Sequence, residues 1–185
     1  NGKLHNSNIN VTNLRNKEIN EYFPNNNIKE YLKNNQIYLK AVLNHNLNLT
    51  LNNSLKLEDY KYNIEGNILE SSIKFNKAFN TNFLTEKIKD IIINNSKVLF
   101  TKTYNEKSIF NIKGKYLFNN SKKEYQKFEI KNIISKSVIE SNANIDLIDS
   151  LSIPVINYKK SKNNVSKLKI KIKKNKNIFN IENLE

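Results

Sequence analysis

The sequence predicts an all-β fold, a β-sandwich of Ig-like or similar antiparallel sheets, with a short N-terminal arm that is partly helical or extended. Three observations predict this class. Apolar and polar side chains alternate over long stretches, as they do on a strand with one buried face. Turn-forming residues recur about every 8–15 residues, a spacing typical of all-β domains. The chain has 185 residues, 38% of them hydrophobic, which is enough to bury a core.

The first segment, residues 1–35, is polar and rich in asparagine, and we expect it to form the arm. Asn27 stands where it can cap a short helix over residues 28–33. Near the start, Ile9, Val11 and Leu14 form an apolar pattern that suits a donor strand, one that completes the sheet of a neighbouring subunit.

Residues 36–174 are expected to form the β-sandwich domain, either as one unit or as two half-size repeats around 36–96 and 97–174. Its first strand pattern is the longest, because apolar residues occupy the odd positions from Ile37 to Leu51 and only His45 interrupts them. The pattern fits one long strand or two strands joined near residue 45.

Further strands follow in order along the domain. Even positions are apolar in residues 60–68 and again in residues 110–118, and a turn at residues 105–106 leads into the second strand, residues 108–118. Residues 85–93 fit either a capped helical turn or a strand. The remaining strand patterns are in residues 97–104, 125–134, 145–158 and 167–173, with Pro154 marking an edge or a bulge. Residues 175–185 are expected to form a C-terminal tail.

Gly66 and Gly114 occupy matching places in two similar segments, residues 62–69 and 110–117. A glycine on the inward parity of a strand indicates a bulge, a bend or a close approach of backbone. The similarity of the segments is compatible with an internal duplication, and also with chance in a chain so rich in Asn, Lys and Ile.

The C-terminal strand is the most basic feature. Lys167, Lys169, Lys171 and Lys173 alternate with apolar residues, so all four project from one face. Two interpretations remain open. The lysines protect an edge strand from unwanted pairing, or they face a polyanion such as a wall polymer or a nucleic acid. The net charge of +14 fits the second interpretation.

Catalysis and metal binding are not expected from this sequence. The chain has no Cys, which excludes a thiol nucleophile and Cys-ligated metals, and its two histidines, His5 and His45, have no acidic or histidine neighbours at ligand spacing. Asp146 and Asp149 suit a solvated strand end. We therefore predict a non-enzymatic protein without a catalytic residue, metal or cofactor.

Half of the chain is Asn, Lys or Ile, with 30 Lys against one Arg, as an AT-rich genome produces. The leading hypothesis is a structural or adhesive subunit of a bacterial surface or extracellular assembly, of the fibre, appendage or spore-coat type. Such a subunit would be a homo-oligomer or part of a larger protein assembly, without a transmembrane segment, and strands could be exchanged between subunits. The alternative is a basic RNA-associated protein, such as a ribosomal protein of an AT-rich organelle or bacterium, with a cytoplasmic or organellar location. The scarcity of Arg and Gly weakens this alternative.

Overall fold

The computed structural model describes residues 3–15, 33–79, 84, 86–119, 124–135, 138–153, 157–161, 164–175 and 178–184. Within these ranges the chain is built from β-strands, which confirms the predicted all-β class. The strands are β1 Lys3–Arg15, β2 Asn35–Leu51, β3 Leu57–Phe79, β4 Ile88–Thr103, β5 Ser108–Phe118, β6 Gln126–Ile134, β7 Val138–Leu147, β8 Leu151–Ile153, β9 Tyr158–Lys160, β10 Ser166–Asn175 and β11 Ile178–Leu184.

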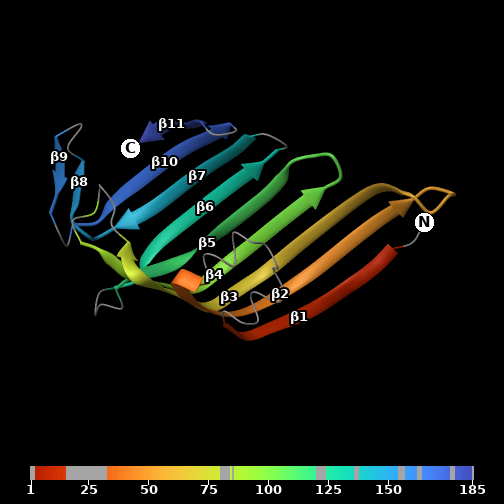
Figure 1. Cartoon of the computed structure of the whole chain (residues 1–185), viewed down its shortest axis with the longest axis horizontal. Helices are drawn as coiled ribbons and strands as arrows, with labels where there is room; N and C mark the ends of the chain where they lie inside the picture. Colours follow the sequence, from red (N-terminus) through yellow and green to blue (C-terminus); the bar gives the residue numbers. More distant parts are fainter. Residues whose placement is uncertain are drawn as a thin grey trace.

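The strands are divided unevenly between two antiparallel sheets. Nine of them form one sheet in the order β1-β2-β3-β4-β5-β6-β7-β10-β11, and β8 and β9 form a separate two-stranded sheet. Figure 1 shows the large sheet as a curved layer with the first and last strands at opposite edges. An Ig-like sandwich instead divides about seven strands between two sheets of similar size. Among the described elements, extensive contacts join only strands that are neighbours in a sheet.

Several predicted segments can be compared with the strands. The alternating odd positions of residues 37–51 lie in one strand, β2, and residues 88–93 begin β4, so the strand interpretation of this segment holds. Residues 145–158 contain the end of β7, then β8 and the first residue of β9. The predicted helix over residues 28–33 and Pro154 lie outside the described residues, except for Lys33. The boundary at residues 96 and 97 falls inside β4.

The large sheet has one apolar face and one polar face. Its register keeps the apolar positions of successive strands opposite each other, as in the pairs Leu43–Gly66, Gly66–Val98 and Val98–Ile112. The core on this face is the cluster of Ile112, Tyr116 and Phe128. Most other apolar side chains of the face are half-buried.

Two of the register shifts in the large sheet lie in its central strands, where they bend the sheet and change which parity of side chains faces the apolar side. One lies between Lys40 and Ala41 where β2 pairs with β3, and the other between Asn94 and Lys97 where β4 pairs with β5. Asn95, within the second shift, has a positive φ of 46°, which is typical of a bulge residue. Because of these bulges, the residues of β3 and β4 that face the apolar side have even numbers on one side of the bulge and odd numbers on the other.

The two strand glycines lie where a neighbouring strand leaves no room for a Cβ. A Cβ on Gly114 would be 2.7 Å from the Cα of Ser96, the fully buried serine of the β4 bulge. A Cβ on Gly66 would be 2.8 Å from the Cα of Leu43 on β2. Side chains at these places would force the strands apart, as expected for a glycine that marks a close approach.

Candidate functional site: a lysine-lined groove on the polar face

The predicted C-terminal lysines lie on the polar face of the sheet. β10 is flanked by β7 and β11, so it is an interior strand here. Lys167 is opposite Asp146 and Lys173 is opposite Glu140, with 3.6 Å between Lys173 Nζ and Glu140 Oε1. Two of the four lysines therefore face carboxylates on β7. Lys169 and Lys171 are opposite asparagines.

Neighbouring strands add further lysines to the same face. A single transverse row runs from β3 to β10, since each member is the register partner of the next. The row consists of Asn67, Lys97, Lys113, Glu129, Asn144 and Lys169. Adjacent strands are about 4.8 Å apart, so this row brings residues from six strands into one line of side chains.

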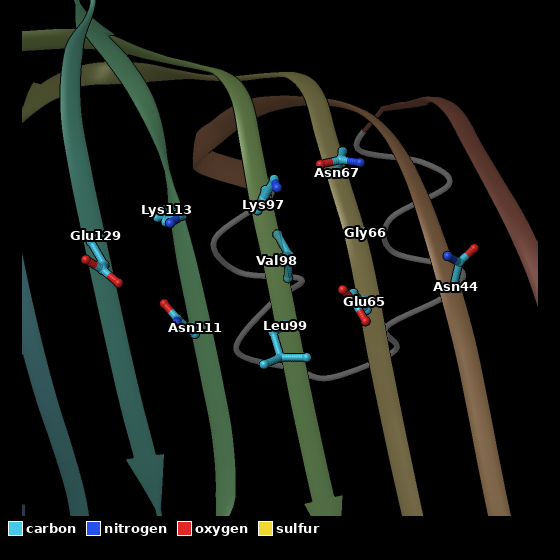
Figure 2. A pocket seen from close by; sticks show the side chains of 10 residues that line it. All are labelled: Asn44, Glu65, Gly66, Asn67, Lys97, Val98, Leu99, Asn111, Lys113 and Glu129. Atoms are coloured by element: carbon cyan, nitrogen blue, oxygen red, sulfur yellow. The ribbon is translucent and has the colours of Figure 1, made fainter.

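A hollow of about 340 Å³ lies on this face across β2 to β6. Figure 2 shows its polar side chains, which come from successive strands and include Lys97, Lys113 and Glu129. Asn111 also lines it, and Asn111 Oδ1 is buried without a hydrogen-bond partner among the described residues. A bound water or ligand with an O–H or N–H group would satisfy this oxygen. The complete lining is Asn44, Glu65, Gly66, Asn67, Lys97, Val98, Leu99, Asn111, Lys113 and Glu129.

A second hollow of about 750 Å³ continues the first towards the C-terminal strands. It shares Lys97, Lys113 and Glu129 with the first hollow and reaches Lys167 and Lys169 on β10. Six lysines and two carboxylates line it, so it has a positive balance. We call the two hollows together the lysine groove. Its lysines are Lys97, Lys113, Lys115, Lys127, Lys167 and Lys169.

Four of these lysines form two directly opposed pairs. Lys97 of β4 is the register partner of Lys113 of β5, and Lys115 of β5 is the partner of Lys127 of β6. Like charges directly opposite each other destabilise a sheet. All four side chains are exposed, and their ammonium groups make no hydrogen bond or ion pair with the residues that the structure describes. We call them the lysine quartet.

The sequence interpretation missed the quartet and placed the polyanion-facing lysines only on β10. Each quartet lysine occupies the polar parity of its own strand, and this signal is visible in the sequence. The four lysines come together only because of the strand order and the bulge at Asn95, which changes the parity of β4.

A buried polar cluster ties the small sheet to the end of the large one. Lys160 is 8% exposed, and its ammonium group donates to the backbone oxygens of Ile148, Asp149 and Ser161 at 2.8–3.2 Å. Desolvation lowers the pKa of Lys160, although nearby Asp149 opposes this shift. The ammonium group satisfies three carbonyl groups at once, and this arrangement is structural.

Tyr116 and Gln126 form the other half of this cluster. The Tyr116 hydroxyl donates to the Asp146 backbone oxygen at 2.8 Å and lies 3.1 Å from Gln126 Oε1. The same Gln126 oxygen accepts from the Ile148 N–H group at 2.7 Å. Burial, with additional repulsion from Asp149 and Asp146, raises the pKa of Tyr116 far above its usual value. The phenol therefore stays protonated and acts as a donor.

His45 lies half-buried on the apolar face of β2. Its Nδ1 atom is 2.5 Å from the hydroxyl of Tyr62 on β3, and desolvation raises the pKa of Tyr62. His5 belongs to β1, but its side chain lies outside the described residues. In the described part of the chain, no three His, Asp or Glu side chains are placed to hold a metal ion.

The candidate donor residues lie in β1, which pairs with β2 of the same chain. Ile9 is opposite Leu43, Val11 is opposite Ala41, and Leu14 is opposite Leu39. These pairs are the ones that an exchanged strand would form with a second copy, so strand exchange stays a prediction.

The described part of the chain contains no helix that is long and apolar enough to cross a membrane. Comparisons of this chain with models of protein families, with curated proteins and with solved structures find no match.

Proposed function

We propose that the chain is a non-enzymatic structural subunit that self-assembles by covering the apolar face of its large sheet with a second copy. One observation supports this proposal above the others, the single-layer arrangement of the described strands. Extensive contacts join only strands that are neighbours in a sheet, and no second sheet of described strands packs on the apolar face.

Within the described part of the chain, each strand has extensive contacts only with its sheet neighbours, so a second copy would supply the missing layer. Two sheets stacked face to face at about 10 Å would interdigitate their apolar side chains.

Charge favours the apolar face as the contact and the lysine groove as the outer surface. The groove lysines lie on the polar face, where two copies of a basic chain repel each other. The apolar face presents Ile134 of β6 opposite Ile139 of β7, and both side chains are exposed. A location on a bacterial surface or in an extracellular assembly is part of the proposal and rests on composition.

Sedimentation velocity over a hundredfold range of concentration tests the proposal. The variant Ile134→Lys/Ile139→Lys places two charges on the apolar face. The matched control Leu99→Lys/Ile109→Lys places two charges on exposed apolar residues of the polar face. We expect concentration-dependent assembly of the natural chain, at least tenfold weakened in the first variant and changed less than threefold in the second. A chain that stays monomeric at millimolar concentration, or equal effects of the two variants, would refute the proposal.

A second candidate, association with RNA, is favoured by the collection of lysines on one face of the sheet. It predicts binding to structured RNA with a steep dependence on salt, because each phosphate contact releases counterions. Filter binding between 50 and 300 mM salt measures the slope, and absence of binding at the lowest salt concentration would eliminate this candidate.

A further inference from the structure

The lysine quartet concentrates four positive charges on three adjacent strands. Opposed residues in an antiparallel pair have Cβ atoms about 4.5–5.5 Å apart, and residues two apart on one strand are about 7 Å apart. Lys113 and Lys115 are two apart on β5, with Lys97 on one side and Lys127 on the other. The four side chains therefore arise from an area of roughly 10 by 7 Å.

The four ammonium groups of the quartet repel one another, and a bound anion would reduce this repulsion. The two opposed pairs lie on hydrogen-bonded strands inside the sheet, and within the described part of the chain no carboxylate forms an ion pair with them. Lysine ammonium groups on long side chains can converge on one compact ligand, and lysine is a common phosphate-binding residue. A multiply charged anion would have more favourable contacts here than a single charge.

The surroundings of the quartet limit the size and the chemistry of the ligand. Glu129 follows Lys113 in the transverse row, and Asp146 lines the groove beside Lys167. These carboxylates interrupt the positive surface between the quartet and β10, so a long polyanion would pass over negative charge. The lining offers no arginine, and its one aromatic residue, Phe128, is only 9% exposed and belongs to the core cluster, so no exposed ring is present on which a base could stack.

We propose that the lysine quartet is a binding site for a compact polyphosphate group, recognised by its charge and its size. This site goes beyond the assembly role and does not depend on it, because the quartet and the apolar contact occupy opposite faces. The ligand contacts the four lysines of the quartet. The β10 lysines of the groove only attract it from a longer distance.

Isothermal titration of the full chain with tripolyphosphate at 150 mM salt tests the site. Orthophosphate serves as the weakly charged comparison, and a twelve-nucleotide single-stranded RNA serves as the extended one. The variant Lys113→Gln/Lys115→Gln removes one member of each opposed pair. The control Lys56→Gln/Lys107→Gln removes the same charge from two exposed turn lysines.

We expect saturable binding of tripolyphosphate, at least tenfold tighter than that of orthophosphate. The quartet variant should weaken it tenfold or more, and the control less than threefold. A melting temperature that rises with tripolyphosphate in the natural chain, but not in the quartet variant, would support the site independently. Equal losses in the two variants, no saturable binding at 150 mM salt, or tighter binding of the RNA than of tripolyphosphate would overturn the proposal.

Discussion

The two faces of the large sheet are built from the same strands but stabilise the fold very differently. On the apolar face, Ile112, Tyr116 and Phe128 bury one another across β5 and β6. On the polar face, the same two strands place Lys115 directly opposite Lys127. The comparison indicates that stability is concentrated on one face, whereas the other tolerates unfavourable contacts. Because the polar face contributes little to the stability of the fold, its side chains are available for binding.

The largest expected effect comes from adding a side-chain carbon at one of the two glycines where neighbouring strands approach closely. Gly114→Ala puts a Cβ against the backbone of Ser96, so β4 and β5 must move apart. We expect the free energy of unfolding to fall by about 3 kcal/mol, at the upper end of typical overpacking costs. Urea denaturation measures this change. Lys115→Ala, the next residue on the opposite face, is the control and should cost less than about 0.5 kcal/mol.

Truncation of a large apolar side chain should have the next largest effect. Phe128 lies between Gly114 and Ile145 in the register, and it stacks edge-to-face with Tyr116 at a centroid distance of 6.0 Å. Phe128→Ala should cost about 2 kcal/mol, less than in a two-layer core, because no second sheet of described strands packs on this face. Leu99→Ala on the polar face, where the side chain is 42% exposed, should cost well under half as much. Equal losses would mean that the faces do not differ in stability.

The raised pKa of Tyr116 predicts that the stability of the fold depends on pH. Its folded pKa is raised above the unfolded value of 10.0, so its contribution to stability is complete below pH 10. Stability should then decline as the pH rises above 10, because only the unfolded chain releases the phenolic proton. Tyr116→Phe should cost about 1 kcal/mol at pH 7 through its lost hydrogen bonds and should flatten the alkaline decline. Thermal unfolding at pH 7–11 measures both. An unchanged alkaline decline in the variant would contradict this assignment.

The smallest expected effect is a gain in stability on the polar face. Lys127→Glu replaces the repulsion from Lys115 with an attraction, and it should stabilise the fold by about 0.5 kcal/mol at low salt. The gain should fade at 1 M salt, where charges are screened beyond about 3 Å. Lys131→Glu is the control, because Lys131 lies opposite Asn111 and Asn142. A loss of stability in Lys127→Glu would show that the opposed lysines are not repulsive.

The sequence was sufficient to predict most strands within residues 36–174 but not their arrangement, and β11 lies in the segment that was predicted as a C-terminal tail. The odd-position alternation of β2 and the even-position pattern of β5 predict those strands because side-chain parity is a local property. Gly66 and Gly114 were recognised as places of close approach, although the partner backbones at Leu43 and Ser96 were not. Whether strands form one sheet or two depends on long-range pairing, and alternation is the same in both cases.

The candidate site shows the same division between local and long-range information. Lys167 and Lys169 stood out because they alternate within one strand, whereas Lys97, Lys113 and Lys127 are far apart in the sequence. Only the register brings them together. The residue that changes the parity of β4, Asn95 with its positive φ, looks like any other asparagine in a chain that has 38 of them.

The strand order itself has a consequence for how the chain acquires its structure. Each strand up to β7 pairs with the one that precedes it, and β10 reaches back to β7 over only the small β8–β9 hairpin. From β2 to β7 the connections have three to eight residues, whereas 19 residues separate β1 from β2. Closing short loops is entropically cheap, so these central hairpins can form early and lengthen the sheet one strand at a time. Folding should therefore be faster than in Greek-key proteins of equal size. Intermediates in which only some of the strands are paired should be populated during folding.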